Sequence, residues 1–185
     1  MLKKTLLAAA VLAMATTAVQ ANEVSGYVTG SMGQSDTKGA NKDFAYKMAV
    51  GLQANPYVAL EAQYTDLGKP SEKGFVVDNA GNLYNAKASL STRGLGANLV
   101  GTLPIDDFKL FAKVGYHKME TKATLKVDGF GSDSGKVREW VPSFGAGASY
   151  AIIPELEVVA EYERFKDVAD AYNVDLASVG LRYNF

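Results

Sequence analysis

Hydrophobic and polar residues alternate one by one along the end of the chain. The apolar positions are Ala177, Val179, Leu181, Tyr183 and Phe185, and the polar positions between them are Ser178, Gly180, Arg182 and Asn184. A period of two residues is that of a β-strand, whose side chains point alternately to its two faces. A strand that is apolar outward, polar inward and aromatic at its end is typical of a wall between lipid and a wet lumen.

Segments with this alternation recur along the chain, each long enough for a tilted strand to cross a membrane. The pattern predicts strands near residues 24–34, 43–54, 57–66, 88–102, 108–120, 138–152, 155–166 and 174–185. In the third of them, Glu61 and Gln63 face one way, while Leu60 and Ala62 face the other. We therefore predict an all-β fold, an eight-stranded antiparallel up-and-down transmembrane β-barrel.

The connections between these strands differ in length on the two sides. Short turns are predicted at residues 55–56, 103–107 and 153–154, with longer polar loops near 35–42, 67–87, 121–137 and 167–173. Residues 129–135 have the glycine-rich and serine-rich composition of a flexible loop. Short turns at one rim and long loops at the other are typical of an outer-membrane barrel, with the short side in the periplasm.

The first 21 residues have the pattern of a cleaved export signal. Lys3 and Lys4 form a basic start, residues 6–15 are apolar, and small residues precede the expected cleavage after Ala21. The expected organisation is a signal peptide over residues 1–21 and an outer-membrane β-barrel domain over residues 22–185. No later segment offers the long apolar run that a membrane-spanning helix needs.

The amino-acid composition argues against several classes of function. Without Lys3 and Lys4, 17 basic and 20 acidic residues remain, so the formal charge of −3 argues against a nucleic-acid partner. The chain has no cysteine, so the fold needs neither disulfides nor thiolate metal sites. A single histidine, His117, argues against a transition-metal site. We expect no cofactor.

Several motifs in order resemble the transmembrane domain of the OmpA family. They are Asn55-Pro56-Tyr57-Val58 followed by Glu61, Leu103-Pro104-Ile105 followed by 111–115, 144–147 followed by Glu161-Tyr162, and the final stretch 178–185. The resemblance implies a small outer-membrane barrel, and it implies that the assembly machinery reads the terminal aromatics, Tyr183 and Phe185. Because the chain stops at the barrel, the tethering role of the family's peptidoglycan-binding domain is not expected.

Charged residues on the inward face form the most informative polar set. They are Lys47, Glu61, Lys113, Glu161, Glu163 and Arg182. A barrel of eight strands is just wide enough for side chains to fill it, and an unpaired charge there is costly, so opposite signs should meet. By resemblance, Glu61, Lys113 and Glu161 match the family's lumen cluster. The position that holds an arginine in that family is Val159 here, so a gating switch is not carried over.

These observations favour a non-catalytic barrel with a structural or surface-interaction role in envelope integrity, adhesion or antigenicity. The expected partners are outer-membrane lipid, lipopolysaccharide, the assembly machinery and a host or cell-surface ligand of the loops, and the expected state is a monomer. A narrow channel for ions or small solutes is the main alternative. A lipid-modifying enzyme that uses His117 is another, and a soluble periplasmic barrel with a polar exterior is the rival at the level of fold.

Overall fold

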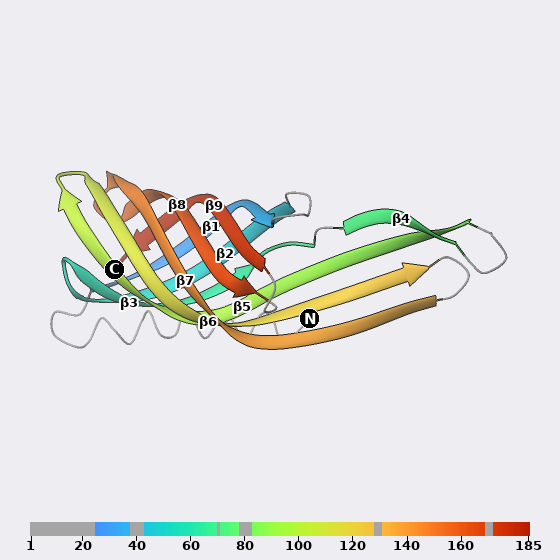
Figure 1. The fold of residues 1–185 in the computed structure, drawn as a ribbon. Helices are drawn as coiled ribbons and strands as arrows, with labels where there is room; N and C mark the ends of the chain where they lie inside the picture. Colours follow the sequence, from blue (N-terminus) through green and yellow to red (C-terminus); the bar gives the residue numbers. More distant parts are fainter. Residues whose placement is uncertain (1–24, 38–42, 70, 78–82, 128–130, 169–171) are drawn as a thin grey trace, which may run out of the picture.

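The computed structural model describes residues 25–37, 43–69, 71–77, 83–127, 131–168 and 172–185 (Figure 1). The predicted signal peptide therefore lies outside the described residues. The strands are β1 (Ser25–Thr37), β2 (Asp43–Asn55), β3 (Val58–Asp66), β4 (Ser71–Val77), β5 (Leu83–Ile105), β6 (Phe108–Val127), β7 (Gly131–Ile153), β8 (Leu156–Val168) and β9 (Tyr172–Asn184). In this part of the chain we find no helix with the length and apolar character to cross a membrane.

Eight of these strands form a closed antiparallel ring. Within the ring, consecutive strands pair with each other, and β3 pairs directly with β5. The first strand, β1, pairs with the last, β9, and closes the ring. At the seam, the backbone N–H groups of Gly26 and Phe185 each donate to the other residue's carbonyl at 2.9 Å. The ninth strand, β4, pairs with β5 beyond the ring. The predicted eight-stranded up-and-down barrel is therefore confirmed.

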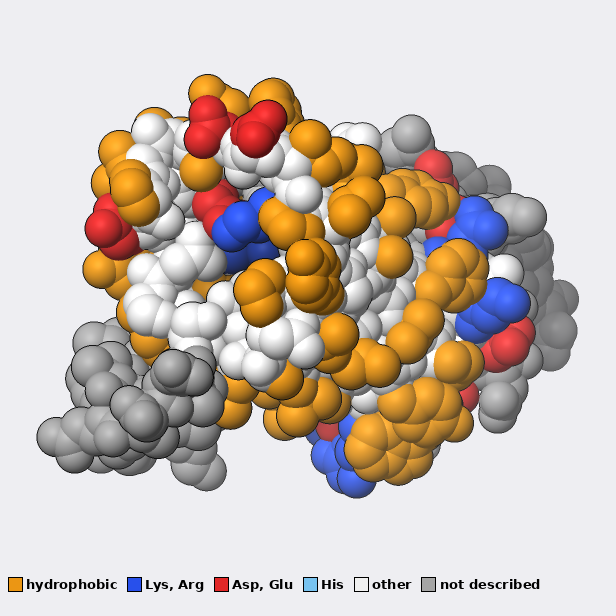
Figure 2. Space-filling view, turned by 90° about the vertical axis from the view of Figure 1, so that its left-hand side faces the viewer, with side chains coloured by type: hydrophobic (Ala, Val, Ile, Leu, Met, Phe, Trp, Pro, Cys, Tyr) orange, Lys and Arg blue, Asp and Glu red, His pale blue; other side chains and the backbone are white. Residues whose placement is uncertain are grey.

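Polarity in this barrel is inverted relative to a water-soluble protein. In β3, Ala59, Glu61 and Gln63 are at most 3% exposed. Leu60, which lies between Ala59 and Glu61, is 60% exposed. Hydrophobic side chains spread around the visible exterior in Figure 2, which views the barrel from the end that carries the short turns. The soluble barrel considered above requires a polar exterior, so the structure argues against it, and an exterior of this kind faces lipid.

The strands β5, β6 and β7 extend well past the ring and, together with β4, form an arm, seen on the right of Figure 1. The arm consists of β4 and the adjoining parts of β5, β6 and β7, and the pairing of β5 with β6 runs without interruption from Ala86–Val127 to Ile105–Phe108. The prediction of long loops at 67–87 and 121–137 was therefore largely wrong. Even residues 131–135, with their loop-like composition, belong to β7. Main-chain hydrogen bonds to neighbouring strands suffice to hold a polar segment extended.

Candidate functional site

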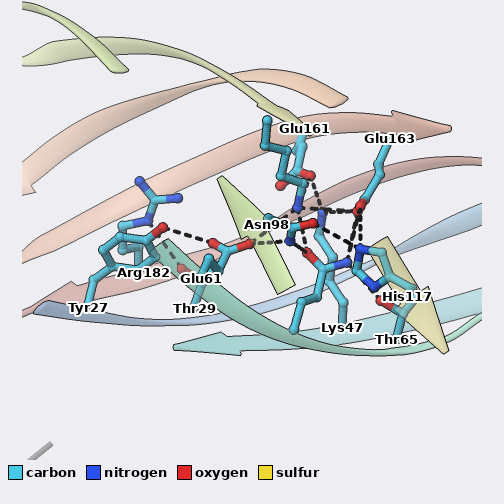
Figure 3. Close-up of polar contacts among 12 residues, drawn as sticks. Tyr27, Thr29, Lys47, Glu61, Thr65, Asn98, His117, Glu161, Glu163 and Arg182 are labelled. Carbon is cyan, nitrogen blue, oxygen red and sulfur yellow. Dashed lines mark hydrogen bonds and ion pairs between the residues drawn. The ribbon is translucent and has the colours of Figure 1, made fainter. Parts of the chain in front are cut away.

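The inward faces of four strands bring five charged side chains together at the middle of the barrel (Figure 3). We call this group the central cluster; its members are Lys47 of β2, Glu61 of β3, Lys113 of β6, and Glu161 and Glu163 of β8. All five are buried. Since strand residues two apart share a face, the alternation that exposes apolar residues to lipid also turns these charges inward.

Lys113 contacts every carboxylate of the central cluster. Its Nζ lies 2.6 Å from Oε1 of Glu161, 3.3 Å from Oε2 of Glu163 and 3.5 Å from Oε1 of Glu61. Lys47 adds a second ammonium group, 2.7 Å from Oε1 of Glu161 and 3.5 Å from Oε2 of Glu163. Two lysines thus face three glutamates, and Oε1 of Glu161 is shared by both lysines.

Neutral polar side chains complete the coordination of these charges. The amide of Asn98 donates to Glu61 at 2.9 Å and to Gln63 at 3.0 Å, and Gln63 in turn donates to Glu163 at 3.0 Å. The hydroxyl of Tyr27 donates to the second oxygen of Glu61 at 2.9 Å. Asn98 and Tyr27 were not predicted as lumen contacts, and Gln63 was placed on the inward face without a role; inward parity in the alternation is the signal that marks all three.

Arg182 lies apart from the other five predicted charges. Its guanidinium carbon is 4.2 Å from the ring centroid of Tyr27, its Nε donates to Thr29 at 3.2 Å, and an NH group is 3.8 Å from Glu157. Lys109 also pairs with Glu157. The reason is position along the strand: Arg182 lies three residues from the end of the chain, at the short-turn rim. Glu157 is a charged lumen residue that the predicted set omitted.

His117 is fully buried beside the central cluster. Its Nε2 lies 2.9 Å from Oδ1 of Asn98 and 3.8 Å from Oε1 of Glu163. Because the amide nitrogen of Asn98 already donates to Glu61 and Gln63, Oδ1 is the acceptor and His117 donates. The imidazole also packs edge-on against Phe165, with ring centroids 5.3 Å apart. Gly96 opposite leaves the space for this ring, since a Cβ there would be 2.4 Å from it.

Two layers of buried apolar side chains enclose the central cluster along the barrel axis. The layer toward the short turns consists of Tyr27, Ala59, Val100, Phe111 and Val159. The layer toward the arm consists of Ala45, Leu67, Met119, Val141, Phe165, Val168, Val174 and Leu176. Buried polar side chains lie among both layers, since Ser149 is the strand partner of Val159, Ser143 is the strand partner of Phe165, and Arg182 packs on Tyr27 and Phe111.

An eight-stranded barrel with an apolar exterior and a buried polar interior defines a transmembrane β-barrel of the outer-membrane type. Residues 5–185 match the model of the outer membrane protein beta-barrel domain family, and the chain belongs to this family. It is 30% identical to outer membrane protein A of Salmonella typhi over 141 residues, which cover 73% of this chain and 38% of that protein. Outer membrane protein A of Shigella dysenteriae is 31% identical over 143 residues. The predicted resemblance to the OmpA barrel is confirmed, and the chain spans about 38% of these relatives' length.

Two solved structures of bacterial proteins have the same fold. Ail of Yersinia pestis, solved in complex with the heparin analogue sucrose octasulfate, has a TM-score of 0.61 at 15% identity and covers 88% of this chain and 99% of its own. Neisserial surface protein A has a TM-score of 0.56 at 15% identity, with 88% and 97% covered. Membership of the outer membrane protein beta-barrel domain family places the protein in the bacterial outer membrane.

Proposed function

We propose that the protein is a non-catalytic, non-conducting barrel that anchors in the outer membrane and presents its arm at the cell surface. The observation that carries the proposal is the enclosure of the central cluster between two buried apolar layers, while β4 to β7 extend past the ring. The barrel then serves as a membrane anchor, and the arm serves envelope integrity, adhesion or recognition outside the cell.

The apolar layers argue against the channel alternative. An ion that crosses the lumen has to pass Phe111 and Val159 on one side and Met119 and Phe165 on the other, all at most 5% exposed. Moving an ion past such closely packed apolar side chains is costly. The salt bridges of the central cluster act in this proposal as a polar core that fixes the packing of the barrel.

The environment of His117 argues against the lipid-modifying enzyme. Its side chain is 0% exposed and packs beneath the layer that contains Phe165, so a lipid outside the barrel has no direct path to the imidazole. Protease OmpT of Escherichia coli is among the similar solved structures, but its TM-score of 0.50 at 11% identity indicates a shared fold alone. No chemistry is carried over from it.

Two further roles belong to this proposal. Tyr183 and Phe185 act as the signal that the assembly machinery recognises. The backbone hydrogen bonds of Phe185 with Gly26, at the β1–β9 seam where the barrel closes, support a role of this residue in assembly. The arm is the part that contacts other molecules at the surface. Ail, whose structure holds a heparin analogue, offers a precedent for ligand binding on this fold.

Surface display can be tested by cysteine labelling, because the chain has no cysteine of its own. We expect Ser134→Cys, exposed on the arm, to react with a membrane-impermeant maleimide in intact cells. Asp107→Cys, in the turn between β5 and β6, should react only after the outer membrane is permeabilised. Labelling of Asp107→Cys but not Ser134→Cys in intact cells would show that the arm points into the periplasm and would refute the proposal.

A further inference from the structure

Five basic side chains lie together on the outer face of the arm, where it leaves the barrel. We call them the basic patch: Arg93 of β5, Lys118 and Lys122 of β6, and Lys136 and Arg138 of β7, all exposed. The strand register places Lys118 opposite Trp140, Arg93 and Arg138 on the two sides of Glu120, and Lys122 opposite Lys136. They therefore form consecutive rows on one continuous surface.

The basic patch begins at the level of the membrane interface and on the side that faces lipid. Along the outward face of β6, apolar residues continue to Tyr116, whose ring stacks on Trp140 at a centroid distance of 5.7 Å. At roughly 3.4 Å per residue and a tilt of about 40°, the segment from Phe108 to Tyr116 spans about 21 Å of height, close to the ~25 Å apolar band of such barrels. Lys118 is the next residue on this face, at the depth of lipid headgroups.

Few carboxylates neutralise the basic patch. Glu120 bridges the two arginines, with Nε of Arg138 at 2.7 Å and NH2 of Arg93 at 3.0 Å. Hydrogen bonds from Arg138 and Arg93 lower the pKa of Glu120 to about 2, so it stays ionised at neutral pH. Asp66 faces Arg93 in the register of β3. Lys118, Lys122 and Lys136 form no ion pair with any residue in the described ranges.

Among the described residues, five cations against two carboxylates give the basic patch a formal charge of +3, on a chain that is acidic as a whole. We propose that the basic patch binds the phosphate groups of the lipid anchor of lipopolysaccharide in the outer leaflet. Cationic side chains just outside the apolar band attract anionic headgroups, and guanidinium groups suit phosphate geometry. This inference rests on the outward orientation of the arm that is proposed above.

The choice of lipid over a free polyanion follows from position. The basic patch continues the face of β6 that contacts lipid and begins beside the aromatic pair of Tyr116 and Trp140. Lys87 lies on the same face of β5 as Arg93, six residues farther out, which is about 20 Å along the strand. A lipid headgroup should contact Lys118 but not Lys87, whereas a soluble polyanion has no reason to distinguish them.

The single tryptophan of the chain, Trp140, gives a direct readout of binding. Full-length refolded protein in zwitterionic detergent micelles is titrated with lipid A, and the emission of Trp140 is followed. We expect a saturable change with lipid A, its weakening by salt, and no such change with a phosphate-free analogue of lipid A. Equal responses to lipid A and the phosphate-free analogue would overturn the proposal.

Matched variants place the interaction on the basic patch. Lys118→Gln should weaken lipid A binding about fivefold, and the triple variant with Lys122→Gln and Lys136→Gln on the order of 100-fold, since each basic side chain near an anionic surface contributes about a fivefold factor. Lys87→Gln should change it less than about twofold. All four lysines lie outside the central cluster, and the heat-modifiable gel shift confirms that each variant is folded.

Two outcomes contradict the assignment. Unchanged lipid A binding in the folded triple variant would remove the basic patch from the interaction. Equal losses from Lys87→Gln and Lys118→Gln, together with comparable binding of a soluble sulfated oligosaccharide, would identify a free polyanion as the partner instead of lipid. Because the titration uses micelles, it does not depend on cellular orientation, so it can fail or succeed independently of the cysteine-labelling test.

Discussion

Replacing Lys113 by methionine is expected to lower the free energy of unfolding by about 3–5 kcal/mol, the range for breaking a buried ion pair. The change leaves Glu61, Glu161 and Glu163 with Lys47 as the one remaining lysine of the central cluster. Methionine has a similar length and stays within the buried volume, so the loss reports on charge rather than on a cavity. Urea unfolding in lipid vesicles measures the effect.

The control for this substitution lies five residues along the same strand. Lys118→Met also removes an ammonium group from β6, but on the exposed face, and should change stability by no more than about 0.5 kcal/mol. The double variant Lys113→Met with Glu161→Gln should be less destabilised than the sum of the two single variants, by about 0.5–3 kcal/mol. Coupling to Glu61→Gln should be smaller, since that contact is 3.5 Å and the Glu161 contact is 2.6 Å. Strict additivity for both pairs would show that the charges do not meet.

Placing arginine at Leu99 is expected to cost about 2–4 kcal/mol, the range for a charged residue at the middle of the bilayer. Leu99 is 55% exposed on the outward face of β5, midway between Leu95, which lies near the aromatic pair, and Leu103, which lies near the short turn. The guanidinium of Leu99→Arg would have to reach either interface along the strand or remain in lipid.

Leu103→Arg is the matched control, with the same substitution on the same face of the same strand. Near the interface its cost should be only about 0–1 kcal/mol. The measurement is again the free energy of unfolding in lipid vesicles. Equal costs at the two positions, or a negligible cost at Leu99, would contradict the assignment of this surface to the bilayer.

The barrel itself could be predicted from sequence because lipid imposes a strict rule on it. Every second residue of a spanning strand has to be apolar, as Leu60 between Ala59 and Glu61 illustrates. Outside the membrane this constraint ends. Residues 121–124 and 132–136 carry polar and small residues on both faces, so their composition resembles that of a loop even though their backbones pair as strands.

The charged residues of the site could be named from parity, but their partners could not. Lys113 meets Glu161 and Glu163 across the lumen, and such contacts depend on strand register, tilt and closure of the ring. Strand register and tilt also separate Arg182 from the central cluster. Arg182 and the cluster residues all point inward, but they lie at different positions along the barrel axis. The apolar layers were also missed, because inward residues such as Val159 and Phe165 have no pattern that marks them as part of a seal.

The conductance of the refolded full-length protein in a planar lipid bilayer tests the closed lumen most directly. Two buried apolar layers and a paired central cluster predict a current at the level of the protein-free membrane, while a porin refolded in the same lipid gives clear steps. Lys113→Met is measured alongside, once its gel shift shows a folded barrel. A current that passes through the lumen should change in this variant. Steady single-channel steps in the wild-type protein that change in size in Lys113→Met would contradict the account and identify the lumen as a conducting path.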